Sequence, residues 1–136
     1  MTPFYLKVVA SDKVFYDGMC VSLVVPIDDG NLGVLAHHEN EAMVISSGEI
    51  SIHTENDEVI HGFVGDGFME ILNGEVTVVV LSAEKPEDID DVRAREALER
   101  AKEELKREQS YIEHEHSVAS LARATHRLEL KNKYKK

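Results

Sequence analysis

The chain changes character at Pro86, and this boundary limits the folds it can adopt more than any other feature. Before Pro86, apolar residues occur in short blocks separated by glycine, asparagine and aspartate. After it no glycine or proline occurs, and Ala, Leu, Glu, Lys and Arg dominate. Residues 1–84 carry two basic and 14 acidic side chains, whereas 13 of the 15 lysines and arginines follow. This division predicts a β unit over residues 1–84 and a helical unit over residues 85–136.

Composition narrows the classes of partner. The net charge of -11 argues against nucleic acid as a partner of the β unit, because phosphates would be repelled. No apolar run approaches the roughly 20 residues needed to span a bilayer, so we expect contact with a membrane only through partner proteins. Cys20 is the single cysteine, which excludes a disulfide framework and a cysteine metal cluster. We expect Cys20 to be buried in a strand, and the protein to work in a reducing, cytoplasmic setting.

The first unit shows the pattern of a small antiparallel β-sandwich. Residues 49–53 (E-I-S-I-H) alternate with period two, which predicts a strand with one buried and one wet face. Asn73-Gly74 between two apolar runs predicts a two-residue hairpin. The cluster from Asp28 to Gly33 predicts a turn, because its glycines can adopt positive φ. Further strands are predicted over residues 4–10, 19–27, 42–46 and 58–64.

From residue 87 the apolar period becomes helical and predicts an antiparallel two-helix hairpin. Asp88 is the predicted N-cap of the first helix, and residues 109–111 interrupt the pattern between the helices. Both apolar stripes are thin and rich in alanine, so packing should be close but weak. The stripe of the first helix is Ala94, Ala97, Leu98, Ala101 and Leu105, and that of the second is Val118, Leu121, Ala122, Thr125 and Leu128.

Charged residues on the two helices form a candidate anion site. Asp90 and Arg93 are three residues apart on the first helix, and Arg123 and Arg127 are four apart on the second. If the chain turns near Ser110, Arg93 and Arg127 lie level, and clustered guanidiniums suit phosphate oxygens. The alternative interpretation is ordinary solvated helix charge. A helical wheel also places Arg127 nearly opposite the second apolar stripe, so convergence would need an outward-lying ligand or a bent helix.

Other constellations give no catalytic hypothesis. The sequence contains no nucleophile–base pair and no phosphate-binding loop, so we expect no catalytic residues. The histidines lack the spacing of a metal site, and His38 is interpreted as a contact residue or as one without a special role. The stretch from Arg123 to Lys136 carries six basic residues against Glu129 alone. It either complements the helix dipole or forms a basic arm for an acidic protein surface.

Four stretches in order resemble one known family, the epsilon subunit of bacterial F-type ATP synthase. Gly30–His38 (G-N-L-G-V-L-A-H-H) resembles the family's G-x-L-G-v-l-x-x-H stretch. Phe63–Glu70 (F-V-G-D-G-F-M-E) resembles its G-G-f-x-e-v stretch. Ile89–Ala94 fits the I/L-D-x-x-R-A motif linked to ATP binding, and Arg123–Leu128 has the R-A-x-x-R-L form of the second helix.

The resemblance implies a non-catalytic subunit of the rotating central stalk, in a complex that translocates protons or sodium ions at the cytoplasmic face of the bacterial plasma membrane. The sandwich would bind the gamma subunit and the ring of c subunits, with Asn31, Leu32 and His38 as partner contacts. The hairpin would lie folded, or extend toward the catalytic alpha and beta subunits and inhibit ATP hydrolysis.

The resemblance also implies a regulatory ligand. ATP, held by Asp90, Arg93, Arg123 and Arg127, would favour the folded hairpin, and no other cofactor or metal is expected. The alternative function is a free-standing ATP-sensing module of the same shape. The chain departs from the family pattern at residues 39–41 (Glu-Asn-Glu), where a small residue and proline usually occur, and at Asp66, which replaces a glycine.

Overall fold

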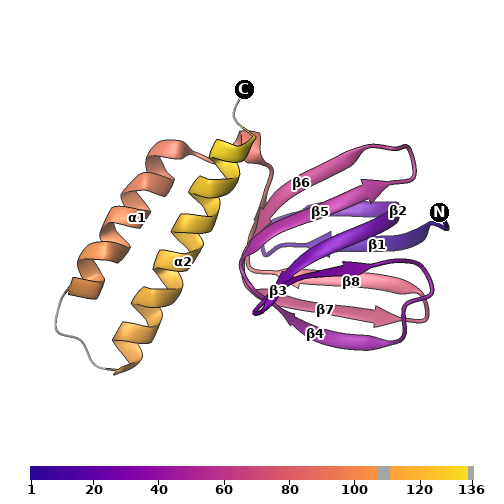
Figure 1. The fold of residues 1–136 in the computed structure, drawn as a ribbon, viewed down its shortest axis with the longest axis horizontal. Coiled ribbons are helices and arrows are strands. Elements are labelled where there is room, and N and C mark those ends of the chain that lie inside the picture. The colour runs from indigo at the N-terminus through magenta and orange to yellow at the C-terminus, as the bar shows by residue number, and fades with distance from the viewer. Residues whose placement is uncertain (107–110, 135–136) are drawn as a thin grey trace. The chain divides into compact units, whose positions relative to one another are not determined.

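The computed structural model describes residues 1–106 and 111–134, and of residues 111–113 only the backbone (Figure 1). Its contacts divide the chain into two compact units, Met1–Lys85 and Pro86–Lys136. The division falls one residue after the predicted boundary. The break predicted at residues 109–111 lies largely outside the described residues.

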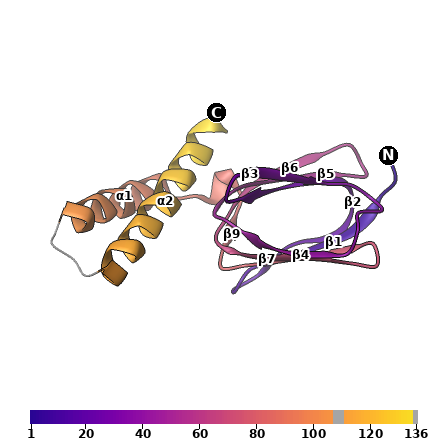
Figure 2. The same cartoon turned by 60° about the horizontal axis from the view of Figure 1, so that its bottom comes forward.

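The first unit is a β-sandwich of two layers, as the alternating pattern predicts (Figure 2). One layer has the order β4-β7-β8-β1-β2, and the other contains β3, β2, β5, β6 and β9. The strands are β1 (Phe4–Val9), β2 (Val14–Ile27), β3 (Gly30–Val34), β4 (Glu41–Ile45), β5 (Gly48–Thr54), β6 (Val59–Val64), β7 (Gly67–Leu72), β8 (Glu75–Val80) and β9 (Ala83–Glu84).

The long strand β2 joins the two layers. Its first half pairs with β1, from Val14 to Cys20, and its second half pairs with β3 and β5. The pairing of β1 with β8 is parallel, and the local pattern of the sequence did not indicate it. Such a pairing joins residues about seventy positions apart, so tertiary packing decides it.

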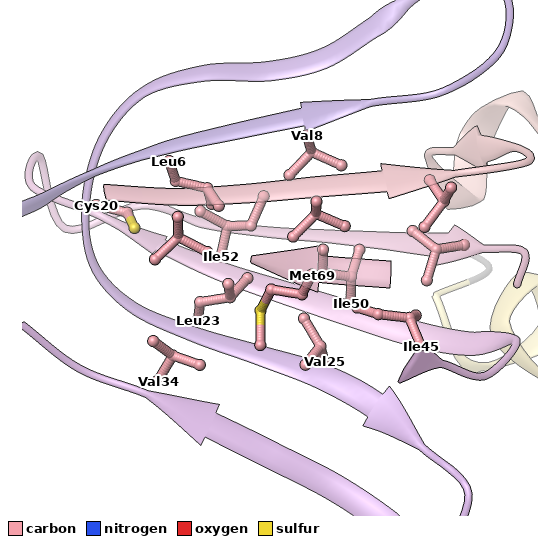
Figure 3. Close-up of a cluster of buried hydrophobic side chains, with 14 of the residues drawn as sticks. Leu6, Val8, Cys20, Leu23, Val25, Val34, Ile45, Ile50, Ile52 and Met69 are labelled. Carbon is pink, nitrogen blue, oxygen red and sulfur yellow. The ribbon is translucent and has the colours of Figure 1, made fainter. Parts of the chain in front are cut away.

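The core lies between the layers and is built from strands of the first unit alone (Figure 3). Alternate residues of each strand point inward, which buries one apolar set and leaves the other set at the surface. Leu6 and Val8 from one layer and Ile50 and Ile52 from the other are fully buried. Since this core is complete within residues 4–83, the sandwich has the means to fold by itself.

Cys20 lies in β2 and is fully buried, as predicted, and burial raises the pKa of its thiol from 9.0 to about 11. The unfolded thiol therefore ionises first as the pH rises. Through linkage, stability is unaffected below pH 9 and falls between about pH 9 and 11, by on the order of 2 kcal/mol. Urea unfolding of wild type and Cys20→Ala at about pH 8 and pH 10.5 measures this loss. An equal loss in both proteins would exclude Cys20 as its source.

The turns follow the sequence with one exception. Asn73 and Gly74 both have positive φ and connect β7 to β8 in the predicted two-residue hairpin. The predicted turn from Asp28 to Gly33 was too long. Only Asp28 and Asp29 form the turn, and Gly30 begins β3, because its neighbours Asn31 and Leu32 find partners on β2.

The second unit is the predicted helical hairpin, preceded by a short 3-10 helix, Pro86–Asp88. Helix α1 spans Asp91–Lys106 and helix α2 spans Tyr111–Lys133, and the two pack side by side (Figures 1 and 2). The predicted N-cap was wrong: Asp88 ends the 3-10 helix, and Asp90 caps α1 by accepting from the backbone N–H of Val92 at 3.0 Å.

The face of α2 that packs against α1 also differs from the prediction. Ser117 is buried and its Oγ donates to Glu104 Oε2 on α1 at 3.3 Å, so Ser117 faces α1. Ala124, two turns further, is buried on the same side. Val118, which was predicted to be in the stripe, is 44% exposed. Small residues at these positions allow the helices to approach closely. Close packing stabilises the hairpin more than burial of the larger Val118 side chain would.

Candidate nucleotide site and docking surfaces

Asp90 holds the start of α1. Its Oδ1 accepts hydrogen bonds from the backbone N–H groups of Val92 at 3.0 Å and Arg93 at 3.2 Å. These bonds satisfy donors that have no partner within the helix. The capped end fixes Arg93 in the first turn, where its side chain is exposed. The cap at Asp90 therefore sets the position of Arg93 through contacts within the protein alone.

The cross-helix bond between Ser117 and Glu104 fixes the register of the hairpin. Arg93 lies 11 residues before Glu104 and Arg127 lies 10 after Ser117, so at 1.5 Å per residue the two differ in height by about 1.5 Å. Arg123 lies one turn below Arg127, and its Nη2 donates to Ser120 Oγ at 3.1 Å. The hairpin thus brings Arg93 and Arg127 level.

The corrected packing face also changes where Arg127 points. At about 100° per residue, Arg127 lies about 60° from Ala124 around α2, and Arg93 lies about 100° from the buried Ala94 around α1. In an antiparallel pair these rotations carry both side chains to the same flank of the hairpin, and Asp90 and Arg123 face that flank too. The four residues share one flank without an outward ligand or a bent helix. A hollow of about 440 Å³ on α1 is lined by other residues: Arg95, Glu96, Glu99, Arg100 and Glu103.

The outer face of the β4-β7-β8-β1-β2 layer carries a continuous apolar row. Strand pairings place one apolar residue from each of the five strands side by side across it. The exposed fraction is 70% for Val44, 53% for Phe68 and 54% for Val14, and Val9 and Val79 are partly buried. We call this set the apolar row: Val44, Phe68, Val79, Val9 and Val14. Five strands span about 19 Å, and an exposed apolar row of that length marks a protein interface.

Sequence reasoning missed the apolar row. The sequence of β7 carries a signal of this row. After Gly67 the strand reads F-M-E-I-L, and both of its alternating faces contain apolar residues. A strand with one face in the core and one in water should show polar residues on the second face. The departure from that pattern at Phe68 and Leu72 could have indicated a second buried face.

The predicted partner-contact residues lie toward opposite ends of the sandwich. Asn31 and Leu32 lie at the start of β3, beside the turn between β2 and β3, and Asn31 is exposed. His38 follows the other end of β3, in the connection to β4, where its Nδ1 lies 2.9 Å from the carbonyl oxygen of Glu39. The structure therefore does not bring His38 together with Asn31 and Leu32.

The residues that depart from the family pattern make local contacts. Asn40 Oδ1 accepts from the backbone N–H of Asn73 at 2.9 Å, which ties the connection before β4 to the β7–β8 turn. Glu41 Oε2 lies 3.9 Å from His38 Nε2. Asp66 Oδ1 accepts from the backbone N–H of Ser47 at 3.1 Å, which a glycine could not do. These side chains stabilise the connections between strands.

Two features are absent from the described residues. Among residues 1–106 and 111–134, no group of three His, Cys, Asp or Glu side chains could hold a metal ion. Neither helix in that part of the chain is long and apolar enough to cross a membrane.

A sandwich with an exposed apolar row, followed by a hairpin with an arginine-rich flank, defines a small two-unit protein built to dock onto others. Residues 3–86 match the family model of the ATP synthase delta/epsilon chain β-sandwich domain, and residues 87–132 match the delta/epsilon chain long α-helix domain. The chain belongs to the delta/epsilon chain family of ATP synthases, which confirms the resemblance and the predicted fold.

Relatives match this chain over nearly its whole length. The ATP synthase epsilon chain of Ruminiclostridium cellulolyticum is 35% identical over 98% of both chains. That of Caldanaerobacter subterraneus is 33% identical over 96% of this chain and 95% of the relative. A chain in the mitochondrial ATP synthase of Euglena gracilis has the same fold, with a TM-score of 0.78 at 19% identity, covering 92% of this chain and 79% of the other.

Proposed function

We propose that this chain is the epsilon subunit in the rotating central stalk of a bacterial F-type ATP synthase, and that synthesis and hydrolysis take place on other subunits. The observation that carries the proposal is the apolar row on the outer face of the sandwich. A monomer that worked alone would gain nothing from exposing Phe68 and Val44 side by side. The protein would be held peripherally at the cytoplasmic face of the membrane by its partners.

The apolar row is the proposed docking site for the gamma subunit. One end of the sandwich carries Asn31 and Leu32, and the other carries His38. With gamma on the apolar row, these ends remain available for the ring of c subunits. A rotor subunit needs both contacts at once, and their separation on the sandwich allows this. The alternative, a free-standing ATP-sensing module, requires neither contact.

Replacing Phe68 tests this assignment. Phe68→Asp should lower the affinity for purified gamma subunit at least about 100-fold, because a charge would be buried in the centre of the interface. The matched control is Val59→Asp, since Val59 is 50% exposed but lies on β6 in the other layer. Calorimetry with the isolated gamma subunit measures both. Equal affinities for the two variants would exclude the apolar row, and no binding by wild type would favour the free-standing module.

We further propose that the hairpin binds ATP without turnover on the flank shared by Asp90, Arg93, Arg123 and Arg127. Arginines placed level on two helices suit phosphate oxygens, and Asp90 offers an acceptor for sugar hydroxyls as well as the cap. Binding that selects the folded hairpin would stabilise it by mass action, by about 2.7 kcal/mol at a ligand concentration of 100 times the dissociation constant, and so would raise its melting temperature.

Arg127→Lys tests the site. The planar guanidinium makes two parallel hydrogen bonds to a phosphate and lysine cannot, so the substitution should weaken ATP binding about tenfold while charge is conserved. Arg95→Lys is the control, because Arg95 is exposed on α1 and lies about 100° to the other side of Ala94, on the opposite flank of the hairpin. Calorimetry and thermal melting with ATP supply the measurement. If millimolar ATP changes neither, this chain has no working nucleotide site.

A further inference from the structure

A second row of side chains runs beside the apolar row on the same outer face. Strand pairings align Ala42, Glu70, Thr77, Lys7 and Asp17 across the five strands. On β4, β7, β8 and β1 two residues along the strand separate the two rows, a distance of about 7 Å, and on β2 a register shift makes the separation three residues. Any partner that covers Phe68 and Val79 therefore also covers Glu70, which lies on β7 between Phe68 and Leu72.

Glu70 is exposed, and in the described part of the chain it makes no hydrogen bond or ion pair. Its neighbours in the row, Ala42 on β4 and Thr77 on β8, carry no charge. Lys7 lies two strands away, at about 10 Å between backbones, and makes no ion pair with Glu70.

Asp17, at the other end of the row, differs from Glu70. It accepts a hydrogen bond from the hydroxyl of Tyr5 on β1, and this bond raises the pKa of Tyr5. Asp17 thus has a partner within the sandwich, whereas Glu70 depends on whatever docks there.

An uncompensated carboxylate in the middle of a docking face is costly to cover. A partner that removed Glu70 from water without a counter-charge would pay its desolvation, and one that supplied a cation would gain both affinity and register. The first unit carries 14 acidic and two basic side chains up to residue 84, so a second copy of the chain would repel this face. A basic partner is complementary to it.

We infer that Glu70 is a specificity-determining contact, paired on docking with an arginine or lysine of the partner set about 7 Å to the side of an apolar strip that covers the apolar row. This inference rests on the proposed function, since the partner is then the gamma subunit. The apolar row attracts the partner's apolar strip but does not determine how far along the row the strip is placed. Glu70 determines this alignment, because only one placement of the strip brings the partner's cation to the carboxylate.

The test measures association and dissociation rates with purified gamma subunit by surface plasmon resonance. Glu70→Gln should weaken binding about tenfold and Glu70→Lys at least about 30-fold, mostly through faster dissociation. The control is Glu55→Lys, since Glu55 is exposed in the turn between β5 and β6, away from this face. It changes net charge equally, and should slow association about threefold or less while leaving dissociation unchanged.

Circular dichroism establishes that each variant is folded. Glu70→Gln binding at wild-type affinity, or equal effects of Glu70→Lys and Glu55→Lys, would overturn the inference while leaving the gamma contact intact. Absence of binding by wild type would overturn the proposed function together with it. A gamma subunit with one lysine or arginine reversed to glutamate, restoring affinity for Glu70→Lys alone, would identify the paired cation.

Discussion

Gly67→Ala is expected to destabilise the sandwich by more than about 4 kcal/mol. A Cβ at position 67 would lie 2.0 Å from the carbonyl oxygen of Val79 and 2.7 Å from the Cα of Val80. Both atoms belong to the backbone of β8, which pairs with β7 at this point. Relief therefore requires the strands to separate, with loss of pairing beside the core.

The matched control is Gly33→Ala. A Cβ there would meet no atom within 4 Å, and its φ is not positive, so the change should stay within about 0.5 kcal/mol. Urea unfolding of the full chain, followed by the β signal in circular dichroism, compares the two. Similar midpoints would mean that the strands accommodate the methyl group at little cost. Asp66, the neighbour that replaces a family glycine, is exposed, which explains why a side chain is tolerated there but not at Gly67.

Deletion of residues 86–136 is expected to raise ATP hydrolysis by the assembled complex several-fold. The hairpin has two proposed locations, folded or extended between the catalytic subunits. Among its described residues the buried ones of α1 and α2 are mostly small (Ala94, Ala101, Ser117 and Ala124), with Leu130 the one large exception, so they remove little apolar area from water. The free-energy difference between the two states is then small enough for ATP binding to shift their populations.

The measurement is hydrolysis by reconstituted complex with full-length or truncated chain, at low and high ATP. The truncated chain retains the whole sandwich core and should still assemble through the apolar row. Full-length chain should inhibit most at low ATP and at low salt, because basic residues between Arg123 and Lys136 would contact an acidic surface.

Charge removal gives a second comparison. Neutralising Arg123, Arg127, Lys131 and Lys133 together should relieve part of the inhibition, although loss of ATP binding by the two arginines acts in the opposite direction. Equal rates in every condition would exclude regulation and leave a purely structural subunit.

Much of the local structure was predictable from the residues themselves. The Asn73-Gly74 hairpin, the switch to helix after Pro86 and the burial of Cys20 each depend on a few neighbouring residues. The N-cap was assigned two residues early, to Asp88, because several acidic residues in succession offer the same acceptor. Only the hydrogen bonds to Asp90 choose between them.

The sequence by itself determined that this chain makes a sandwich and then a hairpin, because period, turn chemistry and composition act over a few residues. Tertiary structure alone decided which faces meet. The parallel pairing of β1 with β8, the apolar row and the position of Glu70 beside that row depend on strands far apart in the chain. On α2, close packing selected Ser117 and Ala124 over Val118, and that rotation placed Arg127 on the flank of Arg93. The apolar pattern of a sequence shows how much surface could be buried. The shape of the neighbouring element determines which part of that surface is buried.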